Sequence, residues 1–513
     1  MKRGIFMKDY KNLKSGSDVR GYASDIFGNE MDLTEEAVFD ITAAFVPFLA
    51  ERSGKKADEL TVSVGHDSRI TAEKIKAKVV KALVSAGVTV LDCGLSSTPA
   101  MFMTTVKLSA DGAVQITASH HPADRNGLKF FLPTGGLDGS DINEILLAAN
   151  EGKKAPEAKG SVKEIDFMTE YAAMLRELIC RELGVKEEDK PLKDYHIVVD
   201  AGNGAGGFYA SKVLEKLGAD TAGSVYLEPD GMFPNHIPNP ENAVAMASIS
   251  DAVINSKADL GVIFDTDVDR AGCVDPDGVE INRNRLIALA AAIALENEPG
   301  STVVTDSVTS AGLKEFIEKD LGGKHHRFKR GYKNVINEAE RLCAEGINAP
   351  LAIETSGHAA LKENYFLDDG AYLVTKIIIK MAKLGREGKS ISDLTASLKM
   401  PAEEKELRFS IEVEDFRTYG ECVIEGLQRW CEAKTEYGFI IADDNREGIR
   451  VSVKDGWFLL RLSVHDPVMP FNVESDSAGG VKKILETVEE FFYNCRFLGT
   501  ESLRDYMDGE NEE

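Results

Sequence analysis

Short apolar runs recur along the first 400 residues, and most are followed by a longer stretch with one apolar face. In the stretch 71–86, Ile75, Val79 and Leu83 fall on one face of a helix, and Gly87 is a suitable stop. Such alternation of strands with helices is typical of α/β domains with covered sheets. The pattern predicts strands at 60–64, 88–91, 113–117, 196–199, 260–264, 302–305 and 351–353, and helices at 71–86, 167–183 and 311–319.

The pattern changes near Met400. Three later stretches alternate apolar and polar residues, as strands with one solvent-facing side do, and an amphipathic helix follows them. We therefore expect three successive α/β domains and a smaller C-terminal α+β domain. The C-terminal strands are predicted at 407–413, 449–453 and 457–464, its helix at 478–493, the domain boundaries at 1–165, 166–298, 299–400 and 401–513, a loop at 151–163 and a frayed end at 508–513.

The amino-acid composition excludes several classes of partner and site. The chain has 513 residues, of which 43% are hydrophobic, enough for several cores. Its net charge of −25 argues against nucleic acid or an anionic membrane as the main partner, because both attract basic surfaces.

Seven scattered cysteines without a Cys-x-x-Cys pair indicate neither a disulfide framework nor a zinc site. The first ten residues are polar, and no apolar run nears the ~20 residues of a membrane span, so we expect a cytoplasmic protein. The pattern specifies no oligomeric state.

Ser119 is the first candidate for chemistry. It follows the predicted strand 113–117 and precedes His120 and His121, with Lys129 a few residues further on. A serine at a strand end can face a cleft, where His supplies proton transfer and Lys compensates phosphate charge. An ordinary turn serine with surface histidines is the alternative.

Three aspartates, Asp265, Asp267 and Asp269, directly follow the predicted strand 260–264. Alternate side chains on a tight loop can converge on one point, and three uncompensated carboxylates would repel one another. Carboxylates at that density suit Mg²⁺ together with a phosphate oxygen, whereas a solvated acidic turn is the alternative. Arg270 can hold a phosphate oxygen that the metal does not take.

Two later motifs offer ligands for a sugar phosphate. Glu354 and Ser356 can hydrogen-bond sugar hydroxyls, Gly357 permits a close approach, and His358 can move a proton or bind an anion. A helix-entry turn explains this motif equally well. Further on, Arg461 and Ser463 alternate along an extended segment and together would grip a phosphate, unless they are ordinary residues of a sheet edge.

Two other classes of enzyme share parts of this pattern. The run from Asp265 to Val268 also fits the nucleophile motif of haloacid-dehalogenase-type phosphatases, in which the first aspartate is phosphorylated, although that motif normally opens its domain. The run Gly202-Asn203-Gly204-Ala205-Gly206-Gly207 matches the Gly-x-Gly-x-x-Gly of dinucleotide-binding folds, with Glu228 as a ribose-binding acid. A sugar-phosphate-binding relative without activity is a third alternative.

Taken in chain order, the motifs resemble the α-D-phosphohexomutase superfamily, and most of all its phosphomannomutase/phosphoglucomutase branch. The resemblance covers nearly the whole chain. Its further signatures are Ser17-Asp18-Val19-Arg20-Gly21, Val64-Gly65-His66-Asp67-Ser68-Arg69, Gly94-Leu95-Ser96-Ser97-Thr98-Pro99-Ala100, Pro229-Asp230-Gly231-Met232-Phe233-Pro234 and Pro238-Asn239-Pro240.

The resemblance implies an α/β protein with mixed sheets and four domains around a central cleft. It also implies a phosphoserine enzyme that interconverts hexose 1- and 6-phosphates of glucose or mannose through a 1,6-bisphosphate, with phosphoglucosamine and phosphopentose mutases as relatives. One Mg²⁺ per chain and a glucose 1,6-bisphosphate-type activator belong to this picture. The implied roles are Ser119 as phosphoryl carrier and metal ligand beside Asp265, Asp267 and Asp269; Lys129, Arg20, His120 and His358 near the transferring group; and Glu354, Ser356, Lys333, Arg270, Arg461, Ser463 and His465 on the substrate.

Two positions depart from the family's pattern. His465 stands where the phosphate loop usually has Thr or Ser, which makes phosphate binding there more dependent on pH. Ile353 stands where a Gly often precedes the sugar-loop Glu, and the chain is some tens of residues longer than is usual in the family.

Overall fold

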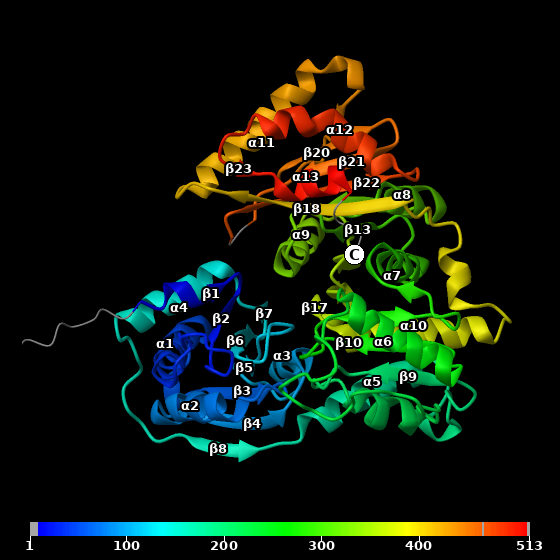
Figure 1. Ribbon diagram of the computed structural model, residues 1–513. Helices are drawn as coiled ribbons and strands as arrows, with labels where there is room; N and C mark the ends of the chain where they lie inside the picture. The colour runs from blue at the N-terminus through cyan, green and yellow to red at the C-terminus, as the bar shows by residue number, and fades with distance from the viewer. Residues whose placement is uncertain (1–8, 464–465, 510–513) are drawn as a thin grey trace, which may run out of the picture. The chain divides into compact units, whose positions relative to one another are not determined.

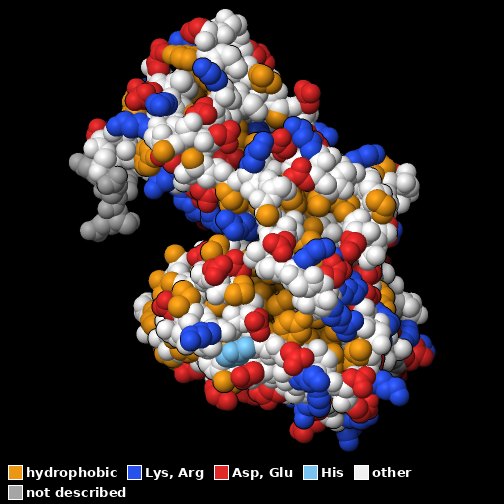
Figure 2. Space-filling view, turned by 90° about the vertical axis from the view of Figure 1, so that its right-hand side faces the viewer, with side chains coloured by type: hydrophobic (Ala, Val, Ile, Leu, Met, Phe, Trp, Pro, Cys, Tyr) orange, Lys and Arg blue, Asp and Glu red, His pale blue; other side chains and the backbone are white. Residues whose placement is uncertain are grey.

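The computed structural model describes residues 9–463 and 466–509, and the chain divides into two compact units (Figure 1). The first unit runs to residue 286 and includes residues 356–393, whereas the second unit holds residues 287–355 and everything from 394 onward. Acidic and basic side chains are interspersed on the face that Figure 2 shows, so the net negative charge forms no uniform acidic surface there. Among the described helices, none has the length and apolarity that crossing a bilayer requires.

The first unit begins with a mixed sheet in the order β1-β2-β6-β5-β3-β4-β8, with β7 beside β6. β3, β4, β5 and β8 run parallel, whereas β1, β2 and β6 are antiparallel to their neighbours. The predicted strands at 60–64, 88–91 and 113–117 are confirmed as β3, β4 and β5. The bounds are β1 Lys14–Ser15, β2 Asp18–Tyr22, β3 Thr61–His66, β4 Thr89–Leu95, β5 Gly112–Ile116, β6 Arg125–Leu132, β7 Gly135–Gly136 and β8 Ser161–Glu164.

Helices cover both faces of this sheet. In α2, Ile75, Val79 and Leu83 are buried as predicted, in one core with apolar residues of α1 and α4, while α3 packs on β3, β5 and β6. The expected loop at 151–163 is confirmed for residues 151–160, but its last three residues belong to β8, a fully exposed edge strand that pairs with β4. The helices are α1 Glu35–Ser53, α2 Ala72–Ser85, α3 Thr98–Lys107 and α4 Gly139–Asn150.

The second sheet of the first unit has the order β12-β11-β10-β9, with β9 and β10 parallel and the others antiparallel. Its predicted strand 260–264 and helix 167–183 are confirmed with unchanged bounds. α6 packs on β9, β10 and β11, and α10 returns from much later in the chain to contact β11 and α5. The bounds are α5 Phe167–Leu183, β9 Ile197–Asp200, α6 Ala243–Ser256, β10 Leu260–Phe264, β11 Ala271–Val274, β12 Glu280–Ile281, β16 Ala359–Leu361, β17 Leu367–Asp368 and α10 Gly370–Gly385. α7, Arg283–Asn297, begins in the first unit and continues into the second.

The second unit contains β14, β13 and β15, which are parallel neighbours in that order, with α9 packed on β13 and β15. The strands predicted at 302–305 and 351–353 are confirmed with the same bounds. The helix predicted at 311–319 forms as α8, continued by the π-helix η6. The bounds are β13 Thr302–Thr305, α8 Ala311–Glu315, η6 Phe316–Asp320, β14 Lys324–Arg327, α9 Tyr332–Ala344 and β15 Leu351–Ile353.

The C-terminal part of the second unit is an antiparallel sheet, β19-β20-β21-β22-β18-β23. α11 and α12 bury apolar residues against it, as the alternating pattern predicts. The predicted fold class is thereby confirmed, whereas the exact domain boundaries stay predictions. Asp508 ends α13, and residues 510–513 of the predicted frayed end lie outside the described residues. The bounds are β18 Glu403–Ile411, α11 Phe416–Ala433, β19 Ile440–Ile441, β20 Ile449–Val453, β21 Gly456–Leu460, β22 Val468–Ser475, α12 Gly480–Tyr493, β23 Leu498–Gly499 and α13 Glu501–Asp508.

Candidate active site

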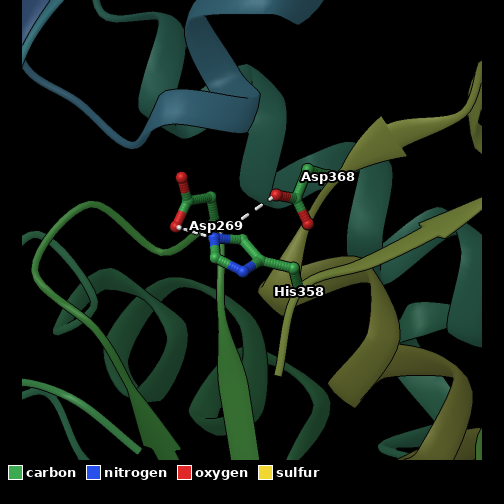
Figure 3. A group of neighbouring side chains, drawn as sticks. All are labelled: Asp269, His358 and Asp368. Atoms are coloured by element: carbon green, nitrogen blue, oxygen red, sulfur yellow. Dashed lines mark ion pairs between the residues drawn. The ribbon is translucent and has the colours of Figure 1, made fainter. Parts of the chain in front are cut away.

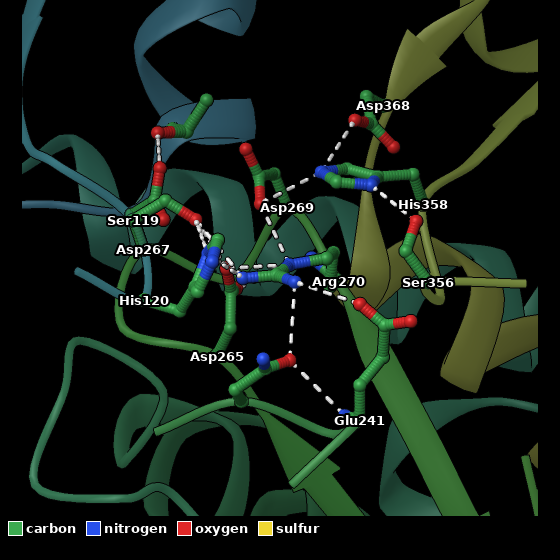
Figure 4. A network of polar contacts seen from close by, with 12 residues as sticks. Ser119, His120, Glu241, Asp265, Asp267, Asp269, Arg270, Ser356, His358 and Asp368 are labelled. Carbon is green, nitrogen blue, oxygen red and sulfur yellow. Dashed lines mark hydrogen bonds and ion pairs between the residues drawn. The ribbon is translucent and has the colours of Figure 1, made fainter. Parts of the chain in front are cut away.

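Ser119 lies just beyond the carboxyl end of β5, where the chain turns sharply. Its φ of 51° is in the left-handed region, which a non-glycine residue adopts only at a cost of about 1–3 kcal/mol. This conformation directs the hydroxyl toward the second sheet of the same unit, where Oγ donates to Asp265 Oδ2 at 3.0 Å (Figure 4). The side chain is buried, and Oγ accepts a hydrogen bond from Arg270 Nη2 at 3.1 Å. Ser119 is therefore not the ordinary surface-turn serine of the alternative interpretation.

The three aspartates converge as predicted. Asp265, Asp267 and Asp269 follow β10, each is almost fully buried, and one carboxylate oxygen from each lies within 4.8 Å of the others. The loop bends at Val268, whose φ is 67°. Within the described chain, Asp267 Oδ1 and Asp269 Oδ1 are buried oxygens that accept no hydrogen bond. Buried carboxylate oxygens without donors are the ligands that a hard divalent cation takes, so these residues fit a metal ion.

Lys129 on β6 joins this cluster from the first sheet. Its Nζ contacts Asp269 Oδ2 and lies 3.2 Å from Asp267 Oδ2. Burial alone would raise the pKa of Asp269, but the Lys129 and Arg270 cations together lower it. For Asp265, burial and the neighbouring Asp269 charge raise the pKa well above its ordinary value. In this cluster three carboxyl groups thus share two neighbouring cations, Lys129 and Arg270.

Arg270 links the serine to the aspartates. Besides Ser119, its guanidinium donates to Asp265 Oδ2 at 3.0 Å and to Asn239 Oδ1 at 3.1 Å, and Nη2 lies 2.6 Å from His120 Nδ1. Burial and the Arg270 charge lower the pKa of His120, so its ring is neutral near pH 7. A neutral Nδ1 that faces this donor acts as a hydrogen-bond acceptor.

His121 and Arg20 lie on the first-sheet side of the site. Burial and then the Arg20 charge lower the pKa of His121 to about 3. Arg20 is on β2, opposite Gly127 of β6, and donates to Asp18 Oδ2 at 2.7 Å. Strand pairing thus brings this arginine alongside the strand that carries Lys129.

The ring of His358 faces Asp269 and Asp368 (Figure 3). Its Nε2 lies 3.8 Å from Asp269 Oδ1 and 3.7 Å from Asp368 Oδ2, and its Nδ1 is 2.8 Å from Ser356 Oγ. Burial and the Arg270 and Lys129 cations lower the pKa of His358 well below its ordinary value. The ring is therefore neutral at pH 7.

Gly357 makes this placement of His358 possible. Its φ is 92°, and a Cβ there would stand 2.7 Å from the carbonyl oxygen of Ala271. Backbone next to the aspartate loop therefore lies against this glycine, whereas the close approach of a sugar expected there stays a prediction.

The remaining predicted residues belong to the second unit. Glu354 is buried and accepts a hydrogen bond from the Gly331 N–H at 2.6 Å, and Lys333 is in the first turn of α9. Arg461 and Ser463 follow β21, and their N–H groups donate to Pro470 and Val468 of β22. Burial and the Arg330 charge lower the pKa of Arg461. His465 lies outside the described residues.

Two residues in contact with the site were not singled out by the sequence patterns. Thr98, at the start of α3, donates its hydroxyl to Asp267 Oδ2 and its N–H to the Asp267 carbonyl at 2.8 Å. Asp368 faces His358 from β17. Thr98 is part of a quoted signature, whereas Asp368 carries no local signal, because only the folded chain brings it to the histidine.

The glycine-rich run after β9 serves close packing. A Cβ on Gly204 would stand 2.6 Å from the Thr266 carbonyl oxygen, and one on Gly207 would stand 2.2 Å from that of Leu227. Protein backbone therefore occupies the space that a dinucleotide would need at these two glycines.

Comparison with known proteins identifies the family of the chain. Family models of phosphoglucomutase/phosphomannomutase α/β/α domains I, II and III match residues 12–155, 169–278 and 282–400. A phosphomannomutase/phosphoglucomutase of Pseudomonas putida is 30% identical over 83% of this chain and 86% of its own. A phosphoglucomutase of Neisseria gonorrhoeae is 29% identical over 92% and 95%. Among solved structures, a phosphoglucomutase/phosphomannomutase family protein from Burkholderia thailandensis has a TM-score of 0.76 at 23% identity, covering 95% of this chain and 98% of its own, which shows a shared fold.

Fold, site and relatives together define an isomerase that acts on hexose phosphates. The chain belongs to the phosphoglucomutase/phosphomannomutase family of the α-D-phosphohexomutase superfamily. It is a hexose phosphate mutase.

Proposed function

We propose that the protein interconverts the 1- and 6-phosphates of glucose, mannose or both, with Ser119 as the phosphoryl carrier. The observation that carries this proposal is the surroundings of Ser119 Oγ, which lies 3.0 Å from Asp265 and 3.1 Å from Arg270 in a buried site. Relatives named phosphoglucomutase and phosphomannomutase support the two sugars.

The first transfer moves a phosphoryl group from phospho-Ser119 to the free hydroxyl of the sugar monophosphate. The P–Oγ bond breaks, a P–O bond to the sugar forms, and the hydroxyl proton passes to Nε2 of His358. The resulting 1,6-bisphosphate turns over, and Ser119 Oγ, held as the oxyanion by the hydrogen bond from Arg270 Nη2, attacks its other phosphoryl group. The P–O bond to the sugar breaks, and the released sugar oxygen takes the proton back from His358. Phosphoryl transfer depends chiefly on alignment and charge compensation. Arg270, which donates to Ser119 Oγ, and Lys129, which contacts Asp269, would supply the compensating charge.

Asp265, Asp267 and Asp269 would hold one Mg²⁺, with an oxygen of Ser119 or its phosphate as a further ligand. When bound, the ion draws charge from the transferring phosphoryl group. A glucose 1,6-bisphosphate-type activator would restore phospho-Ser119 whenever the intermediate escapes.

The second unit supplies candidates for holding the rest of the substrate. Glu354 and Lys333, with Ser356 of the first unit, would contact sugar hydroxyls. Arg461 and Ser463 would bind the phosphate that is not transferred, since Arg presents a planar fork that matches phosphate oxygens. The proposed role of His465 in that loop rests on its position in the sequence alone.

Replacing His358 by glutamine should lower kcat about 10²-fold, the size of a lost general base. Because burial and nearby cations lower the pKa of His358, its neutral form persists below pH 6.5. The ratio of wild-type to H358Q kcat/KM should then stay constant between about pH 6 and 8, since titration of the substrate is common to both.

His196→Gln is the matched control, because His196 contacts Ala222 at the opposite end of β9. The proton-transfer role is wrong if the ratio falls through an inflection near pH 6.5 or if H358Q keeps the wild-type kcat.

A panel of sugar phosphates tests the proposed substrates. Glucose 1-phosphate, mannose 1-phosphate, glucosamine 1-phosphate and ribose 1-phosphate are assayed side by side with Mg²⁺ and glucose 1,6-bisphosphate. We expect kcat/KM for the glucose or mannose ester to exceed that for the other two at least about tenfold. Preference for the glucosamine or ribose ester would overturn the proposed substrate and leave the mutase chemistry intact.

A further inference from the structure

Arg69 ends the signature 64–69, which the proposed function does not use. Its side chain is fully buried, and its guanidinium points into the loop that carries Ser119. Four backbone carbonyl groups of that loop accept hydrogen bonds from it, and the Pro122 carbonyl also accepts from the Arg125 N–H within the loop's own turn at 3.1 Å. Nη1 donates to the carbonyl oxygens of Pro122 at 2.7 Å and Arg125 at 2.8 Å, and Nη2 donates to those of His121 at 2.6 Å and of Ser119.

Strand pairing explains why this arginine reaches the serine loop. β3 and β5 are parallel neighbours with His66 opposite Ile116, so the residues after each strand lie side by side. Asp67 orients both segments. Its Oδ1 accepts from the Arg69 N–H at 3.0 Å, and its Oδ2 accepts from the Thr117 hydroxyl at 2.7 Å. The Thr117 hydroxyl accepts in turn from the Ser119 N–H at 2.9 Å.

The signature 229–234 of the second domain covers the arginine. Gly231 forms a bridge with Arg69, and a Cβ on this glycine would stand 2.4 Å from the Ile70 nitrogen. Phe233 lies next to it with its ring centroid 5.3 Å from the Arg69 guanidinium carbon. Two motifs far apart in the sequence therefore meet on one buried side chain, and the aromatic face excludes water from it.

We propose that Arg69 is a positioning residue that holds Ser119 in its left-handed conformation with Oγ toward the aspartate cluster. The serine loop is strained at Ser119, and a strained conformation persists only where its surroundings over-determine it. A guanidinium satisfies four carbonyl groups at once because its donors form a fixed planar fork. The three donors of a lysine radiate from one point and cannot do so.

Arg69→Met tests the proposal, because Met keeps an unbranched apolar stem and removes every donor. We expect kcat to fall about 100-fold, since a displacement of about 1 Å at the reacting atom costs that much. The KM for glucose 1-phosphate and the Mg²⁺ concentration for half-maximal rate should change less than about threefold, because the aspartate loop and the second unit keep their contacts. Transfer of label from glucose 1,6-bisphosphate to Ser119 should slow in parallel with kcat.

Arg176→Met is the matched control. Arg176 on α5 is also largely covered and donates to a backbone carbonyl, that of Lys212, but has no contact with the serine loop among the described residues. The Arg176→Met enzyme should keep a kcat within about twofold of the wild-type value. Arg69→Lys should recover part of the lost rate and provides the decisive variant if Arg69→Met does not fold.

Wild-type kcat in either Arg69 variant overturns the proposal, as does a fall in kcat that is fully accounted for by the fraction of unfolded protein measured by circular dichroism. The proposal rests on the assignment of Ser119 as the phosphoryl carrier. Ser119→Ala assayed alongside separates the two, because an active Ser119→Ala enzyme contradicts that assignment whatever Arg69 does.

Discussion

Ser119→Ala loses mutase turnover, with kcat lower by at least about 10⁴-fold, because the covalent route disappears with the hydroxyl. The fold should survive. The contacts that shape the serine loop involve backbone atoms of residue 119, namely its N–H to Thr117 and its carbonyl to Arg69, and alanine keeps both. Isomerisation in a coupled assay and the thermal midpoint of unfolding measure the two expectations.

The control for this change is Ser85→Ala, since Ser85 Oγ donates to a carbonyl within α2, away from the site. Incubation with labelled glucose 1,6-bisphosphate adds a second readout. We expect an acid-stable phosphoserine in the wild type and in the control, and no label in Ser119→Ala. An acid-labile phosphate that persists without Ser119 would instead identify Asp265 as the nucleophile and favour the aspartyl-phosphatase interpretation.

Asp267→Asn should lower kcat by two to three powers of ten and raise the Mg²⁺ requirement at least about tenfold. A bound metal stabilises the transferring charge by several kcal/mol, and each 1.36 kcal/mol is a factor of ten in rate. The amide oxygen of Asn can still accept the hydrogen bond from Thr98. Its NH₂ group then stands in place of Oδ1, the carboxylate oxygen that accepts no hydrogen bond, and the side chain loses its negative charge. Rates measured against MgCl₂ concentration, with calorimetric titration of Mg²⁺, check both effects.

Asp277→Asn, at an exposed turn of the same unit, is the matched control and should behave as wild type. Chelation with EDTA should abolish wild-type activity, and added Mg²⁺ should restore it. Full activity after chelation, or an unchanged Mg²⁺ requirement in Asp267→Asn, would show that the aspartate cluster is not the metal site.

Elements whose signal is local could be predicted from the sequence. β10, β13 and β15 keep their predicted bounds because each is centred on a short apolar run, and β20 keeps them because apolar and polar residues alternate along it. The sequence pattern does not predict β8, because all four residues of Ser161–Glu164 are exposed and the strand therefore shows no alternation of buried and exposed positions. Periodicity also identifies a helix without saying which sheet it covers.

The same distinction holds for the candidate site. Asp265, Asp267 and Asp269 are neighbours in the chain, so their convergence could be predicted from spacing. The contacts of Thr98 with Asp267 and of Asp368 with His358 join different elements, and only the pairing of strands and the packing of helices create them. The role of Arg69 depends on carbonyl groups, which every residue has and no sequence pattern marks.

The return of residues 356–393 to the first unit has a consequence for biosynthesis. α10 covers β11 and α5, and Asp369 at its start accepts a hydrogen bond from the buried Tyr171 hydroxyl at 2.6 Å. A nascent chain that has reached residue 286 therefore exposes apolar surface that it cannot yet cover, and a ribosome must add about a hundred more residues first. His358 arrives on that same late segment, so the proposed proton acceptor joins the site only when the first unit can close its core.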